Sequence, residues 1–250
     1  MENRVLVEAC VESVESAVAA AEGGADRIEL CDALVEGGTT PSAGSIRLAR
    51  ARLGIGICVM IRPRGGDFLY TDLEFEVMRD DVAVAKRLGA DGVVLGLLLP
   101  DGTIDRARTA RLVEDALPLP VTFHRAFDVS RDPLESLETL IDLGVHRVLT
   151  SGQRASAMES LDLISHLVDT AGNRITILAG GGITADNAAR IVAATGVSEI
   201  HLYAPRRFPS PMAYRNETVP MGMAYRPEEY VRTVVDPVQI RAVVESVRRT

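Results

Sequence analysis

Short apolar runs that resemble β-strands alternate with helix-like segments along this entire chain of 250 residues. The runs cover residues 4–10, 27–31, 56–61, 92–95, 120–124, 147–150, 176–179 and 199–202. Two helix-like segments end in a similar motif before the next run, at residues 23–26 (Gly-Gly-Ala-Asp) and 88–91 (Leu-Gly-Ala-Asp). Strands that alternate with helices form parallel sheets. Eight such units predict an α/β fold of the (β/α)8 TIM barrel type, with a doubly wound sheet as the second choice.

The whole chain, residues 1–250, is expected to form a single barrel domain. Its length matches the roughly 250 residues typical of this fold. The sequence after the first strand-like run lacks the G-x-G-x-x-G fingerprint with which doubly wound folds bind dinucleotides. We therefore expect no nucleotide cofactor, and the doubly wound alternative is weakened.

The composition argues against several classes of function. A formal net charge of -8 and a pI of about 5.1 disfavour a protein that binds nucleic-acid phosphates. No apolar run approaches the roughly 20 residues that a bilayer span requires, so no membrane role is expected. Three cysteines, and an N-terminus without the features of a signal peptide, predict free thiols in a reducing cytoplasm.

One connection is much longer than the short loops that join most strands and helices. Residues 204–235 link the last strand-like run to the final helix and contain five prolines, which exclude one continuous helix. Connections of this length are commonly functional or form interfaces. We expect a lid over the barrel mouth, or the arm of a homodimer or larger homo-oligomer, with Arg215 turned toward the mouth.

The pattern Glu-x-Cys closes each of the first two strand-like runs, as Glu8 with Cys10 and as Glu29 with Cys31. Side chains alternate between the two faces of a strand, so each glutamate shares a face with the cysteine two positions later. A carboxylate at the end of a fully covered strand reaches water only at the ligand-binding end of a barrel. Because neighbouring strands lie about 4.8 Å apart, two carboxylates and two thiols are predicted to share one small site.

Further polar residues stand at the ends of later strand-like runs, where the site of a TIM barrel lies. The catalytic candidates are Glu8, Glu29, His124, His201 and Asp128. Carboxylates and imidazoles can exchange protons as general acids and bases. The first two glutamates and the two histidines could instead bind a divalent metal such as zinc or manganese. A buried salt-bridge network of the glutamates with Arg62 and Arg125 is the structural alternative.

Two stretches have the chemistry of an anion-binding site. Arg62 and Arg64 flank a proline after the third run, and guanidinium groups pair well with carboxylates and phosphates. A glycine triplet follows the seventh run, where many barrels bind phosphate through backbone N–H groups, although it could also be a plain tight turn. The predicted ligand-binding residues are Arg62, Arg64, Arg125, Ser151, Gly180, Gly181 and Gly182. They would hold a small anionic or sugar-like metabolite for a lyase, isomerase or hydrolase.

The thiols offer a different function. Cu(I) prefers soft thiolate and thioether ligands, and Cys10 with Cys31 would supply the metal-binding pair. Cys58 or Met60 could add sulfur from the third run, and residues 221–223 (Met-Gly-Met) could add it from the long connection. Buried cysteines more often behave as small apolar residues, and that alternative applies to each sulfur taken alone.

Several sequence motifs of this chain together closely resemble those of the CutC family, which is named for copper homeostasis. The matching stretches lie at residues 8–10, 24–31, 36–42, 59–70, 122–128, 149–152 and 180–182. The match extends into the long connection at residues 215–216 and 221–222, so it covers nearly the whole chain.

The resemblance implies a TIM barrel, a cytoplasmic location, a homo-oligomer and a proposed Cu(I)-binding role in which Cys31 is the best-matched thiol. One departure lies at residues 201–204, which read His-Leu-Tyr-Ala where the family usually has a small hydroxyl or thiol residue soon after the histidine. No sulfur ligand is therefore implied at that position. The family name describes copper homeostasis and implies no particular reaction.

Overall fold

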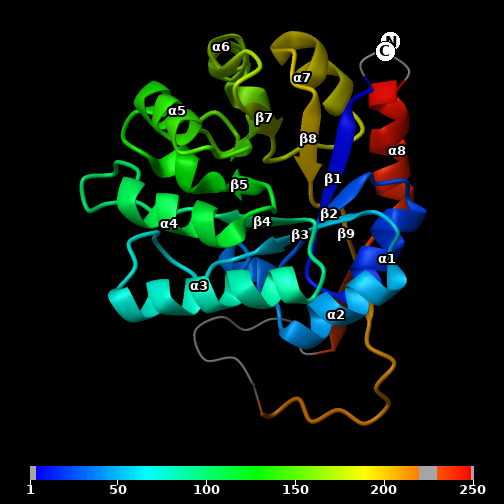
Figure 1. Cartoon of the computed structure of the whole chain (residues 1–250). Coiled ribbons are helices and arrows are strands. Elements are labelled where there is room, and N and C mark those ends of the chain that lie inside the picture. Colours follow the sequence, from blue (N-terminus) through cyan, green and yellow to red (C-terminus); the bar gives the residue numbers. More distant parts are fainter. Residues whose placement is uncertain (1–3, 220–229, 249–250) are drawn as a thin grey trace.

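The computed structural model describes residues 4–219 and 230–248 and has the architecture of a TIM barrel (Figure 1). Eight parallel strands close into a barrel in the order of the sequence. They are β1 Leu6–Val11, β2 Arg27–Leu30, β3 Gly56–Met60, β4 Gly92–Leu95, β5 Val121–Phe123, β6 Arg147–Thr150, β7 Thr176–Ala179 and β8 Glu199–Leu202. Each predicted strand is present, and the closed barrel confirms the predicted fold over the doubly wound alternative.

α-Helices connect successive strands and surround the barrel (Figure 1). They are α1 Val14–Glu22, α2 Ala43–Arg52, α3 Asp72–Arg87, α4 Arg106–Ala116, α5 Pro133–Asp142, α6 Leu161–Ala171, α7 Ala188–Thr195 and α8 Pro237–Arg248. Short 3-10 helices, η1 Leu34–Glu36, η2 Arg125–Val129 and η3 Ala157–Glu159, lie in three of the loops that leave the carboxyl ends of strands. None of the helices in the described ranges is long and apolar enough to cross a bilayer.

Local sequence explains where several helices begin. Thr71 and Glu74 form a capping box at the start of α3, in which each side chain accepts a hydrogen bond from the other residue's backbone N–H. Asp132 caps α5 by accepting a hydrogen bond from the backbone N–H of Glu135, and Pro133 occupies the first helical position. These caps satisfy N–H groups that have no partner within the helix.

The repeated Gly-Ala-Asp motif has one structural role in both places. Gly24 and Gly89 have positive φ angles of 94° and 85°, which favour glycine after a helix. Asp26 and Asp91 then each accept a hydrogen bond from a backbone N–H in the preceding strand, at 3.0 and 2.8 Å. The motif therefore ties the end of a helix to the strand before it.

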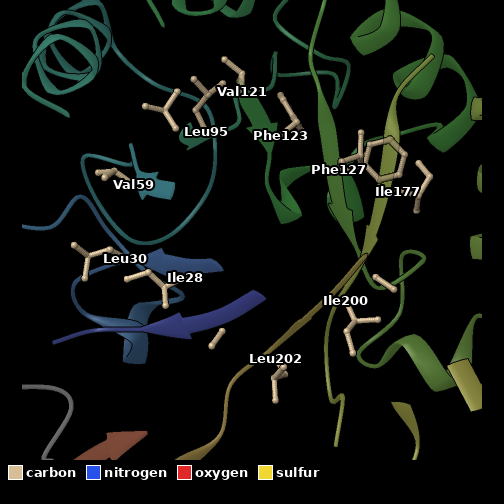
Figure 2. Close-up of a cluster of buried hydrophobic side chains, with 14 of the residues drawn as sticks. Ile28, Leu30, Val59, Leu95, Val121, Phe123, Phe127, Ile177, Ile200 and Leu202 are labelled. Atoms are coloured by element: carbon tan, nitrogen blue, oxygen red, sulfur yellow. The ribbon is translucent and has the colours of Figure 1, made fainter. Parts of the chain in front are cut away.

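The main core lies between the strands and the surrounding helices. Figure 2 shows part of it, including Ile28 and Leu30 of β2 and Ile200 of β8, all completely buried. Successive side chains point to opposite faces of a strand, so the residues that alternate with Ile28 and Leu30 point into the barrel. Arg27 and Glu29 of β2 do so and are buried. The barrel interior is therefore unusually polar along β2.

The long connection forms a two-stranded arm. Strand β9 Pro205–Pro209 pairs antiparallel with β10 Val231–Val235. Residues 211–219 are exposed and leave the body of the barrel (Figure 1). The predicted absence of a continuous helix is confirmed for the described part of this segment, and Met221 and Met223 lie outside the described residues. Arg215 stacks 4.8 Å from the ring centre of Tyr230 within the arm instead of turning toward the barrel mouth.

Candidate functional site

Side chains from β1, β2 and β8 meet inside the barrel. Glu8 lies opposite His201 in the register of β1 and β8, and Cys10 lies opposite Glu29 in the register of β1 and β2. Opposite residues of parallel strands point to the same face, and all four side chains are buried. Cys31 directly follows β2 and continues this face. The structure therefore brings together the residues that the Glu-x-Cys pattern predicted.

The two thiols share one carboxylate oxygen. The Sγ atoms of Cys10 and Cys31 each lie 3.4 Å from Oε2 of Glu29, and these three atoms lie within 4.8 Å of one another. Cys58 and Met60 pack beside them in one sulfur-rich cluster. The other oxygen of Glu29 is buried without a hydrogen-bond partner among the described residues. Such an unsatisfied atom is expected where a ligand or ion completes a site.

The two thiols differ in protonation. A hydrogen bond from Cys31, opposed by burial and aided by His201, lowers the pKa of Cys10 to about 5. The hydrogen bond with Cys10, together with burial, raises the pKa of Cys31 well above its usual range. At neutral pH the pair therefore holds a thiolate at Cys10 and a thiol at Cys31. A metal would find one ligand ready and would displace a proton from the other.

His201 lies between two glutamates. Its Nδ1 is 2.8 Å from Oε1 of Glu8, and its Nε2 is 3.8 Å from Oε2 of Glu29. Burial alone would lower the pKa of His201, but the acidic groups around it, with Glu29 contributing most, raise that pKa well above its usual value. Burial raises the pKa of Glu29 well above its usual range. Groups with such displaced pKa values are suited to proton transfer.

A buried ion-pair network supports Glu8. The Nε of Arg27 pairs with Oε2 of Glu8, and the Nη2 of Arg27 lies 2.6 Å from Oε2 of Glu199. Arg147 adds a second ion pair to Glu199 at 2.9 Å. Burial would raise the pKa of Glu8, but the hydrogen bond with His201 and the charge of Arg27 lower it to about 2. Glu8 is therefore an ionised carboxylate that positions His201.

This ion-pair network was not predicted from the sequence. The sequence suggested Arg62 and Arg125 as the buried partners of Glu8 and Glu29, whereas the structure pairs Arg27 with Glu8 and with Glu199. Arg147 reaches Glu199 and not the two predicted glutamates. Strand alternation contained the signal, because Arg27 stands two residues before Glu29 and so shares its face. A charged residue at the start of a strand more often faces solvent.

His124 follows β5 and lines a cavity at the barrel mouth. It lies outside both groups of close metal-ligating atoms found among the described residues. Those groups are Cys10, Glu29 and Cys31, and Glu8, Glu29 and His201. The structure thus brings together three of the four residues predicted for a divalent metal. The Nδ1 of His124 accepts a hydrogen bond from the backbone N–H of Ala126 at 3.2 Å. Burial and the charge of Arg62 lower the pKa of His124 to about 3, so its ring is neutral.

The two arginines after β3 have different surroundings. Arg62 is buried and lines the cavity, and its guanidinium donates to the carbonyl oxygens of Glu36, Gly38 and Gly66 at 2.8, 2.7 and 2.8 Å. It therefore organises the loops at the mouth, while its Nε remains without a partner among the described residues. Arg64 pairs with Glu74 at 2.6 Å and does not line the cavity.

Asp128 organises the loop after β6. It accepts hydrogen bonds from the backbone N–H groups of Ser151 and Gln153 and from the hydroxyl of Ser151 at 2.9 Å. Arg125 pairs with Asp128 at 2.7 Å and donates to Ser151 Oγ at 2.6 Å. Of these residues, Arg125 lines the cavity. The predicted catalytic role of Asp128 and ligand role of Ser151 remain predictions, and their observed contacts join the loops after β5 and β6.

The glycine triplet after β7 reaches the cavity. Gly181 and Gly182 line it and have positive φ angles of 92° and 70°. Gly180 packs against the barrel interior, where an added Cβ would lie 2.6 Å from Leu149. Gly180 therefore allows close packing against Leu149, and Gly181 and Gly182 form a turn whose backbone borders the cavity.

The cavity at the barrel mouth has a volume of about 530 Å³. Its polar lining includes Cys10, Glu29, Arg62, His124, Arg125, Thr184 and His201, and its apolar lining includes Leu34, Met60, Phe68, Leu149, Ile183, Leu202, Tyr203 and Pro205. Small-molecule sites commonly have volumes of roughly 300–1,000 Å³ and mainly apolar walls. The cavity is therefore large enough for an organic ligand in addition to an ion at the thiols.

Comparison with known proteins matches the CutC family model to residues 5–205. Proteins from Mus musculus and Homo sapiens, both named copper homeostasis protein cutC homolog, are 52% and 51% identical over 96% of this chain and 88% of theirs. A family protein CutC from Chromobacterium violaceum is 49% identical over 96% of this chain and 97% of its own.

Solved structures agree with the fold. The crystal structure of a copper homeostasis protein CutC from Streptococcus agalactiae has a TM-score of 0.76 at 41% identity and covers 79% of this chain and 97% of that one. A phosphoribosylanthranilate isomerase from Thermotoga maritima has a TM-score of 0.58 at 12% identity, covering 98% and 100%, and shows likeness of fold alone. The family model spans residues 5–205 and relatives about 50% identical cover 96% of the chain, so the chain belongs to the CutC family.

Proposed function

We propose that this protein acts in copper homeostasis by binding Cu(I) through Cys10 and Cys31. The observation that carries the proposal is the grouping of these two sulfurs with Glu29 Oε2, all within 4.8 Å of one another in a buried site. For comparison, zinc–sulfur bonds measure about 2.3 Å, so two sulfurs that share one such ion lie no more than about 4.6 Å apart. The observed spacing needs little rearrangement to hold one ion.

The surrounding atoms favour a soft metal ion. Met60 and Cys58 complete a cluster rich in sulfur, and Met60 also lines the cavity. Thiolates and thioethers select Cu(I) over harder ions. The second group, Glu8 with Glu29 and His201, has the mixed ligands that suit a divalent metal. Its Glu8 is already engaged by Arg27, so a divalent ion would compete with an ion pair.

Binding of Cu(I) would change the protonation of the cysteine pair. Cys10 is the ready ligand because its pKa is about 5. Cys31 must lose its proton when the metal arrives. Glu29 is the titratable group 3.4 Å from its Sγ, and His201 lies 3.8 Å from the same carboxylate.

An anaerobic titration of Cu(I) against a competing chelator tests the proposal. The tight site should be lost in Cys31→Ser and in Cys10→Ser, since each removes one ligand. Cys58→Ser is the matched control, because Cys58 is also buried and free but lies outside the group of close ligand atoms. Unchanged affinity and stoichiometry in the Cys10→Ser, Cys31→Ser double variant would reject Cu(I) binding at this pair.

The location and assembly form part of the same proposal. All three cysteines are free, which fits a reducing cytoplasm. The exposed apolar side chains of the arm, Met212 and Tyr214, fit contact with a second copy of the chain in a homodimer or larger homo-oligomer.

The second candidate is an enzyme acting on a small anionic or sugar-like metabolite. The observation in its favour is the cavity of about 530 Å³, which greatly exceeds the space of one ion and lies beside Glu29 and His201. Turnover of any metabolite by wild-type protein that disappears in Glu29→Gln, without loss of Cu(I) binding, would favour this candidate over the first.

A further inference from the structure

Two buried hydrogen-bond donors in the cavity wall have no partner within residues 4–219 and 230–248. The Nε of Arg62 and the Nε2 of His124 are both buried and make no hydrogen bond of good geometry to any described residue, although the buried and likewise unpaired hydroxyl of Tyr70 lies close to the guanidinium of Arg62. Both residues line the cavity at the barrel mouth. Buried polar atoms in folded proteins are nearly always paired, so two unpaired atoms in one cavity wall call for a ligand.

The chemistry of the two side chains shows that both unpaired nitrogens are hydrogen-bond donors. A guanidinium N–H can only donate. In His124, Nδ1 accepts from the backbone N–H of Ala126 at 3.2 Å, so the proton of the neutral ring is on Nε2. Both unpaired atoms are therefore donors, and both require an acceptor. A cation or a donor group would not satisfy them.

The ring of Phe68 borders both donors. Its centre lies 5.1 Å from the guanidinium carbon of Arg62 and 4.9 Å from the ring centre of His124. The backbone of Phe68 is held, because its carbonyl oxygen accepts a hydrogen bond from the N–H of Leu98 at 2.9 Å. The side chain itself is only partly buried. The ring of Phe68 therefore lies beside both residues, on a backbone that is held in place.

We propose that Arg62 and His124 form a binding site for the carboxylate of a small organic acid, which Phe68 covers when the site is empty. The two oxygens of a carboxylate can each accept one of the two hydrogen bonds. The positive charges of Arg62 and Arg125 in the cavity wall favour an anion, and the apolar wall that includes Leu149 favours an organic body behind the charged group. This ligand is independent of copper, because neither donor belongs to the groups of close metal-ligating atoms.

The test is a titration of the metal-free, reduced full-length protein with butyrate, followed by NMR of protein labelled with 15N in histidine. The His124 Nε2 should show a directly bonded proton before the titration, and its resonance should shift saturably as butyrate binds. His146 is the internal control, because its Nδ1 likewise accepts a backbone N–H bond, at 3.2 Å from Val121, but it does not line the cavity. Butylammonium, with the same carbon chain and the opposite charge, should produce no shift.

Variants of the site test the proposal further. His124→Leu should raise the dissociation constant of butyrate about tenfold, the effect of losing one hydrogen bond to a charged group. Phe68→Ala should strengthen binding because the cover is removed. Cys58→Ser, which changes a buried free cysteine that does not line the cavity, should bind butyrate as the wild type does. A proton on Nδ1 of His124, or a resonance that butyrate leaves unchanged in the folded wild-type protein, would overturn the proposal.

Discussion

His201 of β8 and Glu8 of β1 are joined by a hydrogen bond of 2.8 Å between Nδ1 and Oε1, across the strand pair that closes the barrel. Arg27 pairs with the other oxygen of the same carboxylate. The buried side chain of Glu8 therefore contacts both the strand pair that closes the barrel and the imidazole that lies beside the thiols. Changes at Glu8 should therefore affect both the stability of the fold and the chemistry of the site.

Glu8→Gln should lower the free energy of unfolding by about 2–4 kcal/mol, because the amide leaves the charge of Arg27 only partly compensated by Glu199. Urea denaturation of the variant and the wild type measures this difference. Glu22→Gln on the exposed face of α1 is the matched control and should change stability by no more than about 0.5 kcal/mol. Equal stability of the two variants would contradict a structural role for the ion pair.

The same carboxylate predicts a pH dependence. The pKa of Glu8 is about 2 in the folded protein, compared with an ordinary value of 4.5. A group whose pKa is depressed on folding stabilises the protein above its unfolded pKa, and this contribution is lost as the pH falls toward the folded value. The stability difference between wild type and Glu8→Gln should therefore shrink as the pH is lowered from about 5 toward 2. Denaturation at several pH values would show a constant difference if Glu8 did not titrate in this way.

Much of this architecture could be predicted from alternation alone. The eight strands and the shared face of Glu8, Cys10 and Glu29 follow from the period of two in a strand and from the polar residues at strand ends. The ion pair of Arg27 could have been found by the same counting. It was missed because a long side chain at the start of a strand can reach solvent as easily as the interior.

Other contacts leave little trace in a sequence. Arg62 donates to the carbonyl oxygens of residues 36, 38 and 66, and a backbone acceptor looks the same whatever its side chain. The pairing of β9 with β10 was also missed, because 21 residues, 210–230, separate these strands and β9 begins and ends with proline. Long-range pairing of short edge strands depends on packing against α1 more than on local pattern.

Cys10 should react with iodoacetamide much faster than Cys58. Its pKa of about 5 makes it a thiolate at neutral pH, and it lines the cavity. Burial raises the pKa of Cys58 well above that of an exposed thiol. The rate at Cys10, followed by mass spectrometry of its peptide, should change little between about pH 6 and 8. In His201→Asn the rate should increase with pH, and a wild-type rate that rises steeply through neutrality would contradict the assignment of the thiolate.

Gly96→Ala should disturb the position of His124. A Cβ at Gly96 would lie 2.5 Å from Cε1 and Nδ1 of that ring, closer than atoms in contact can approach. We expect a loss of about 1–3 kcal/mol in stability, as for other overpacked cores, together with weaker butyrate binding. Gly54→Ala is the control, since an added Cβ there meets no atom within 4 Å. An unchanged melting temperature and unchanged histidine resonances in Gly96→Ala would contradict this packing.

The exposed arm should mediate self-association. Met212 is 56% exposed and Tyr214 is 75% exposed within residues 211–219, none of which is buried against its own barrel. Exposed apolar side chains on an extended arm commonly mark a contact surface. Light scattering on the wild-type protein should therefore give a mass at least twice the 26.9 kDa of one chain. The double variant Met212→Asp, Tyr214→Asp should shift the protein toward the monomer, because two carboxylates would have to be buried at the contact. Leu73→Asp, which changes an equally exposed apolar residue at the start of α3, should leave the mass unchanged. A monomeric wild-type protein at every concentration, or equal dissociation in both variants, would exclude the arm as the interface.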